Sequence, residues 1–157
     1  MSEVNAKLAM TGTPLANTGV PGQWTTGLCD CCEDSSNCCV TCCCPCVTFG
    51  RNVEIIDQGT TSCAHAGAIY YCLAHIGWAC IYTCTYRTKL RAYFSLPEDP
   101  CGDCLVHFCC LPCAVCQEYR ELKNRGFDPS QGWLANAQKW GQAGLTVPPT
   151  ITPGMTR

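Results

Sequence analysis

The stretch CCVTCCCPC, residues 38–46, holds six cysteines in nine positions and leads directly into an apolar segment. A second apolar segment, residues 63–86, follows after a short turn and contains no Asp, Glu, Lys or Arg. Thiolates are the preferred ligands of soft metal ions, and an uncharged run of more than 18 residues is typical of a transmembrane helix. The two segments predict a mainly α-helical, small membrane protein that handles metal ions.

Composition narrows the class of protein. The chain has 157 residues and 19 cysteines, an odd number, and many of these cysteines are adjacent to one another. Adjacent cysteines rarely pair, and the first residues show no secretory signal pattern. We therefore expect reduced, cytosol-facing, metal-binding thiols, with a disulfide framework as the alternative. The net charge of −2 and the lack of a basic patch argue against nucleic acid as a partner.

The apolar segments predict a helical hairpin. Residues 63–86 reach about 36 Å as a helix and exceed the ~30 Å hydrocarbon core, which makes them a confident span. Residues 38–56 reach about 28 Å but include Arg51 and Glu54, which can pair on one helix face. This segment is therefore a probable span, and the alternative is a helix at the interface.

The flanking segments complete the predicted organisation. We expect residues 1–23 to be a disordered arm, residues 24–126 a cysteine-rich membrane domain with a cytosolic helical region, and residues 127–157 a polar tail. Three basic residues directly after the second span, Arg87, Lys89 and Arg91, predict that this end faces the cytosol. With a hairpin, both termini and the cysteine clusters then face the cytosol.

The first cysteine cluster has the pattern CC-x4-CPC, formed by Cys38, Cys39, Cys44 and Cys46. Pro45 lacks an N–H, so either a helix begins there or the carbonyl of residue 41 is left free. A continuous helix places Cys39, Cys43, Cys46 and Asp57 on one stripe. We interpret the cluster as a metal site, and the alternative is that these small cysteines only pack helices together.

Two further groups of cysteines are candidate ligands. The group that precedes the first cluster consists of Cys29, Cys31 and Cys32. The other group contains two C-x2-C pairs, a spacing typical of zinc sites, and consists of Cys101, Cys104, Cys109, Cys110, Cys113 and Cys116. Zinc is the expected ion, and an iron–sulfur cluster is possible with the same ligands. A structural metal and a transported one fit the spacing equally well.

The motifs CC-x-P-C at residues 42–46 and 109–113 resemble each other. No nucleotide-binding or nucleophile motif is present, so we do not expect an enzyme.

Several motifs together resemble the plant cadmium resistance proteins, which are grouped with cell number regulators, fruit-weight proteins and animal cornifelin. They run from WTTGLCDC at residues 24–31, through CC-x4-CPC and VTFGR at residues 47–51, to DPC at residues 99–101 and CQEYRELKNRG at residues 116–126. The resemblance implies a plasma-membrane protein, often homo-oligomeric, that limits cadmium accumulation and moves zinc or other divalent cations. In the family, CC-x4-CPC is the motif held to matter for metal resistance.

On this basis we expect an oligomeric pore between subunits in contact with membrane lipid. Thiolates including Cys43 would capture the ion, and Glu54 and Asp57 would assist its exit. One alternative is a membrane-anchored metal-binding sink. Another is a regulatory scaffold of organ size in which the metal is structural.

Overall fold

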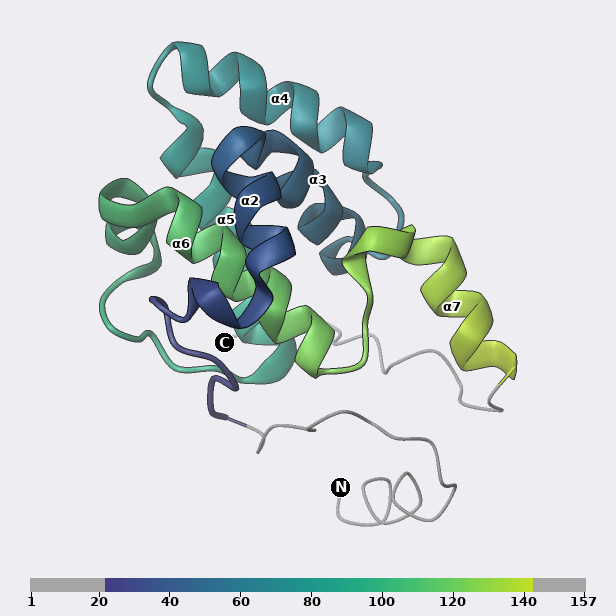
Figure 1. Ribbon diagram of the computed structural model, residues 1–157. Coiled ribbons are helices and arrows are strands. Elements are labelled where there is room, and N and C mark those ends of the chain that lie inside the picture. Colours follow the sequence, from purple (N-terminus) through teal and green to yellow (C-terminus); the bar gives the residue numbers. More distant parts are fainter. Residues whose placement is uncertain (1–21, 143–157) are drawn as a thin grey trace, which may run out of the picture.

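The computed structural model describes residues 22–142, and these residues fold entirely into helices and connecting loops (Figure 1). The elements are, in chain order, η1 (Cys31–Asp34), α2 (Ser35–Cys43), α3 (Pro45–Ile56), α4 (Cys63–His75), α5 (Ala79–Phe94), α6 (Asp103–Asn124), η2 (Pro129–Gln131) and α7 (Gly132–Gln142). The predicted mainly α-helical class is confirmed. The predicted disordered arm, except its last two residues, and the end of the predicted tail lie outside the described residues.

The first apolar segment is broken in the middle of its cysteine motif. Cys44 has non-helical backbone angles (φ −141°, ψ 71°), and α3 begins at Pro45. Proline is well suited to a first helical position because its missing N–H has no partner there in any case. The helical stretches before and after Cys44 differ in direction by 114°. Of the two alternatives for Pro45, a helix start is correct, and the single stripe from Cys39 to Asp57 does not form.

The second apolar segment is also two helices, so the continuous helix expected over residues 63–86 is wrong. α4 ends at His75, and the chain turns at Gly77, whose φ of +78° favours glycine. Composition cannot reveal such a turn, because the residues before and after it are equally apolar and uncharged. Within residues 22–142 no single helix is both long and apolar enough to cross a bilayer; only the bent pair at residues 31–43 and 45–56 has the length and composition.

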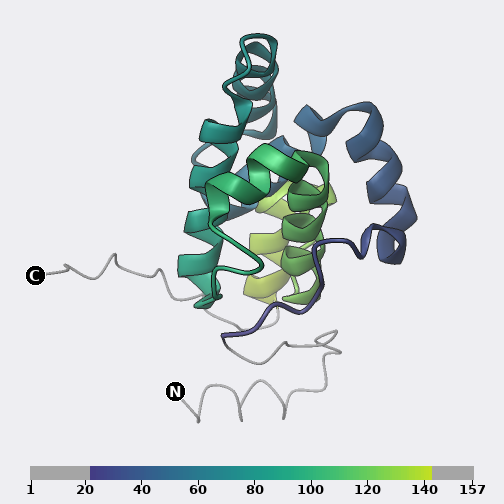
Figure 2. The same ribbon diagram turned by 90° about the vertical axis from the view of Figure 1, so that its left-hand side faces the viewer.

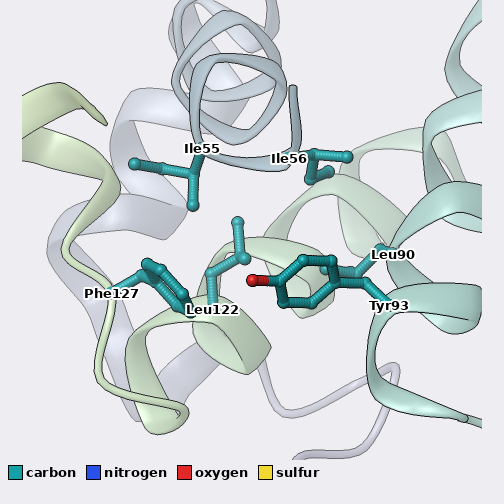
Figure 3. A pocket seen from close by; sticks show the side chains of 6 residues that line it. All are labelled: Ile55, Ile56, Leu90, Tyr93, Leu122 and Phe127. Atoms are coloured by element: carbon teal, nitrogen blue, oxygen red, sulfur yellow. The ribbon is translucent and has the colours of Figure 1, made fainter. Parts of the chain in front are cut away.

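The core lies around α3. Phe49 of α3 is fully buried and packs on Tyr70 of α4 and Tyr86 of α5, with ring centroids 5.4 and 5.6 Å away. At the other end of α3, a small apolar cavity is enclosed by side chains from α3, α5, α6 and the segment after α6 (Figure 3): Ile55, Ile56, Leu90, Tyr93, Leu122 and Phe127. This junction is part of the core and lacks the converging polar groups of a binding site.

The folded part continues beyond the predicted boundary at residue 126. Phe127 is buried and stacks on Trp140 of α7, with centroids 4.9 Å apart. The N–H of Trp133, at the start of α7, donates to Glu54 of α3 at 2.9 Å. Residues 127–142 were expected to open a polar tail. Their aromatic side chains instead close the core at the end of α3.

Candidate functional site

Three segments far apart in the sequence bring six thiols into one region, which we call the three-segment thiol cluster. η1 contributes one cysteine, α2 two and α6 three: Cys31, Cys38, Cys42, Cys110, Cys113 and Cys116. These segments lie side by side in the structure (Figure 1). Predicted ligands from all three cysteine groups therefore meet.

Contacts between individual thiols define the cluster. Cys113 interacts with the thiols of Cys110 and Cys31. Cys38 interacts with Cys42, one turn later on α2, and lies near Cys116. Sequence reasoning did not include Cys42 among the ligands, although its i, i+4 spacing from Cys38 was the signal that places both on one helix face.

Helix breaks position the α6 cysteines. Cys110 has φ −147° and ψ 57°, almost the conformation of Cys44, and Pro112 follows two residues later. Both CC-x-P-C motifs thus interrupt a helix beside the proline, as the missing N–H of proline favours. The predicted similarity of the two motifs extends to this shared backbone break.

The CC-x4-CPC motif is divided between two places. Cys38 faces the three-segment thiol cluster, whereas Cys46 lies against α4, where a Cβ on Gly67 would stand 3.0 Å from its carbonyl oxygen. Cys39 and Cys44 are exposed, as is Cys43 between them. The motif does not close around one point in this chain.

The remaining predicted cysteines lie outside the cluster. Cys29, Cys32 and Cys109 are exposed, and Cys101 is half-buried. Cys104 contacts Cys84 of α5 instead, with 2.7 Å between the two sulfur atoms. Cys84 was not predicted as a site residue, because it lies in the uncharged segment that indicated a membrane span.

Across residues 22–142, no three His, Cys, Asp or Glu side chains are already arranged to hold a metal ion. The donor set of the three-segment thiol cluster nevertheless suits soft ions, because all six donors are sulfur. Ion binding has to draw these thiols together. The ligand roles of the cysteines, and zinc or an iron–sulfur cluster as the bound group, stay predictions.

Two α6 thiols of the cluster, Cys113 and Cys116, have a pKa above the ordinary value of 9.0. Hydrogen bonding to Cys110, burial and the nearby Cys31 raise the pKa of Cys113 to about 12. Burial also raises the pKa of Cys116, and a hydrogen bond with Thr41 only partly offsets this. A metal ion entering the cluster must therefore displace protons.

The two carboxylates expected on an exit route make structural contacts. Glu54 accepts the N–H of Cys63 at the start of α4 at 3.1 Å and that of Trp133 at the start of α7. Asp57 pairs with Lys89 at 2.8 Å and accepts the hydroxyl of Tyr86 at 3.0 Å. Both side chains tie helices to α3, and their role in transport stays a prediction.

The basic residues expected at a membrane edge are also engaged in ion pairs. Arg87 is fully buried, 3.4 Å from Asp103 and 3.8 Å from Glu118. Arg91 pairs with the same Asp103 at 2.8 Å. These residues connect α5 to α6, so their positive charge is largely compensated within the protein. His107, which could have been a ligand, is buried 2.9 Å from Glu118.

Large apolar side chains are exposed along one side of the molecule, which we call the apolar edge. It comprises Tyr71, Ile76, Trp78, Ile81, Leu105 and Phe108, each more than half exposed. They belong to α4, the turn after it, the start of α5 and the first half of α6. In Figure 2 the backbone of the turn after α4 and of the first half of α6 lies on the side towards the viewer. Large apolar side chains exposed on elements that pack against one another are typical of a surface for a protein partner or a membrane.

Comparison with known proteins gives consistent relatives. A model of the PLAC8 family matches residues 24–121. Cell number regulator 7 of Zea mays is 53% identical over 94% of this chain and 88% of its own length. Protein PLANT CADMIUM RESISTANCE 12 of Arabidopsis thaliana is 53% identical over 92% of this chain and 89% of its own length. Protein PLANT CADMIUM RESISTANCE 2 of Arabidopsis thaliana is 51% identical over 87% and 91%. No solved structure matches the chain.

Proposed function

The chain belongs to the PLAC8 family, and from this membership we propose that it serves heavy-metal homeostasis at the plasma membrane by capturing soft divalent cations on thiolates. The three-segment thiol cluster carries the proposal, because six sulfur donors from three segments meet there. Relatives named for cadmium resistance support cadmium as a cation, and zinc is included because it also binds thiolates. Sulfur donors favour such ions over Mg²⁺ or Ca²⁺.

Membrane association in this proposal uses the apolar edge. Trp78 is 63% exposed and Phe108 is 77% exposed. Transfer of such large apolar side chains out of water lowers the free energy of the system. The segment that carries most of the edge, residues 63–86, has no charged residue that would oppose burial in lipid. Aromatic residues are favoured where the hydrocarbon meets the headgroups. The edge therefore supports contact with lipid without a continuous spanning helix.

Two modes of metal handling follow from the proposal. In the first, several copies of the chain form a homo-oligomeric pore and the captured ion moves between subunits. In the second, the thiols retain the ion at the membrane as a sink. The contacts of Glu54 and Asp57 favour the sink, because these carboxylates already hold α4, α5 and α7 in place. The relatives named as cell number regulators favour a third role, a regulatory scaffold.

The experiment uses the full chain in liposomes under reducing conditions. Cadmium binding and cadmium flux are measured for the wild type, for Cys31→Ser/Cys113→Ser, and for the control Cys72→Ser/Cys109→Ser, which changes exposed cysteines outside the cluster. We expect the cluster variant to lose tight cadmium binding while the control keeps it. Equal binding by the two folded variants contradicts the proposed site.

Flux then separates the modes. Cadmium passage that the cluster variant loses assigns the pore, and firm binding without passage assigns the sink. A folded wild-type protein that binds no cadmium removes both modes and leaves the regulatory scaffold.

A further inference from the structure

We propose that Cys84 and Cys104 form an oxidation site, in which a hydroperoxide converts the two thiols into a reversible disulfide between α5 and α6. The inference concerns a site other than the three-segment thiol cluster and does not depend on metal binding. It begins from the separation of the two sulfur atoms, which is 2.7 Å.

This separation favours a covalent bond over a shared metal ion. Sulfur atoms in a disulfide are about 2.05 Å apart, so the pair has to approach by less than an ångström. Two thiolates on one tetrahedral zinc ion, with Zn–S bonds of about 2.3 Å, stand roughly 3.8 Å apart. Binding one ion between them would instead push α5 and α6 away from each other.

Neighbouring contacts hold the two helices at this spacing. Thr88, one turn after Cys84 on α5, donates its hydroxyl to Asp103 at 2.7 Å. Arg91, a further turn along, donates to the same carboxylate at 2.8 Å. Because Asp103 directly precedes Cys104, these bonds fix the backbone that carries the second thiol. The pair is thus positioned before any oxidant arrives.

The two cysteines differ in exposure in the way that a sensor pair requires. Cys104 is exposed and can meet a peroxide, whereas Cys84 is 4% exposed and is reached only through its partner. An accessible cysteine beside a resolving cysteine is the usual arrangement of thiols that respond to oxidants. The two thiols lie on α5 and α6, whose first halves face the viewer in Figure 2.

The chemistry proceeds in two balanced steps. The Cys104 thiol loses its proton, the thiolate attacks a peroxide oxygen and the O–O bond breaks, so that Cys104 becomes a sulfenic acid. The leaving alkoxide, or hydroxide for hydrogen peroxide, takes up that proton and becomes an alcohol or water. The Cys84 sulfur then attacks the Cys104 sulfur, the S–O bond breaks, and the hydroxyl group leaves as water with the Cys84 proton. Small thiols reverse the bond by exchange.

The test treats the reduced, folded full chain with a small molar excess of hydrogen peroxide, alkylates the remaining thiols, and digests without reduction. Mass spectrometry should find the Cys84–Cys104 crosslink as the first disulfide formed. Cys104→Ser should abolish it, while Cys109→Ser, which removes another exposed cysteine of α6, should leave it unchanged. Disulfides that form elsewhere first, with this crosslink absent, overturn the proposal.

A second variant tests the assigned order of steps. In Cys84→Ala the resolving thiol is missing, so the sulfenic acid on Cys104 should persist and react with dimedone. Labelling of other cysteines with none on Cys104 contradicts Cys104 as the residue that meets the oxidant. The wild type gives the same information if Cys84→Ala fails to fold, because dimedone present during oxidation should then compete with crosslink formation.

Discussion

The two halves of α6 differ in which side chains are buried and which are exposed. In the second half, every residue from 114 to 122 is buried, including Gln117, Glu118, Arg120 and Glu121. In the first half, Leu105, Phe108 and Cys109 are exposed, and the helix is interrupted at Cys110. Four polar or charged side chains of the second half are thus inside, whereas two large apolar side chains and a cysteine of the first half are at the surface.

This difference in burial assigns stability to the second half of α6 and binding to the first half. A buried charge is tolerated only when it is paired and hydrogen-bonded, and Arg120 and Glu121 of the second half of α6 meet that condition. Arg120, for example, donates to the hydroxyl of Thr26 and the carbonyl of Gly27, both at 2.8 Å. Exposed thiols and aromatic rings contribute little to folding, so their presence in the first half indicates binding. The predictions below test this division.

The largest effect should come from the buried charged half. Glu121 is fully buried and accepts the N–H of Thr25 at 2.8 Å, its hydroxyl at 2.7 Å, and Arg125 at 2.6 Å. Glu121→Ala should lower the free energy of unfolding by about 3–5 kcal/mol, because it removes a fully buried carboxylate and leaves the half-buried Arg125 without its acidic partner. Urea unfolding followed by circular dichroism measures this change.

The matched control for that prediction is Glu98→Ala. Glu98 is 59% exposed and also pairs with an arginine, Arg91, at 2.8 Å. An exposed pair of this kind contributes roughly 0–1 kcal/mol. Similar losses for the two variants would show that burial of charge does not set the stability of this half.

The next effect concerns the apolar edge. Trp78→Asp/Phe108→Asp should weaken binding to phospholipid vesicles by at least about a hundredfold, since each large side chain contributes roughly 1.5–3 kcal/mol on burial. Vesicle sedimentation gives the affinity. Leu134→Asp is the control, because Leu134 is 70% exposed but lies on α7, away from the edge. Equal weakening by the control would refute the edge as the membrane surface.

The same contrast explains what the sequence could predict. Helical class and the family followed from the sequence motifs, and the structure and comparisons confirm them. Proline chemistry left two alternatives at Pro45, and the structure selects the helix start. The break at Gly77 did not follow, because hydropathy averages over a turn that contains no polar residue. The burial of Arg87 did not follow either, because its partners Asp103 and Glu118 are supplied by a distant helix.

The candidate site was predictable as a list of cysteines but not as an arrangement. Spacing placed Cys110 and Cys113 near each other, since local sequence distance limits their separation. The approach of Cys31 to Cys113, and of Cys84 to Cys104, depends on how α6 packs against η1 and α5. No local pattern contains that information.

The smallest effect should appear in acid, at the point where α3 is tied to α5. Burial alone would raise the pKa of Asp57, but hydrogen bonds from Lys89, Thr61 and Tyr86 outweigh it, so the pKa lies below the ordinary 3.8. A lowered carboxyl pKa contributes stability above the unfolded pKa, and this contribution is lost as the pH falls through the folded pKa.

Asp57→Asn should therefore destabilise the protein by about 1 kcal/mol at pH 7, and the difference from the wild type should narrow as the pH falls below 3.8. Urea unfolding at several pH values measures both quantities. A difference that stays constant down to the acid limit would mean that the substitution removes packing rather than charge. In that case the ion pair with Lys89 would be an ordinary surface contact, and the paired charges that stabilise this protein would be those buried around α6.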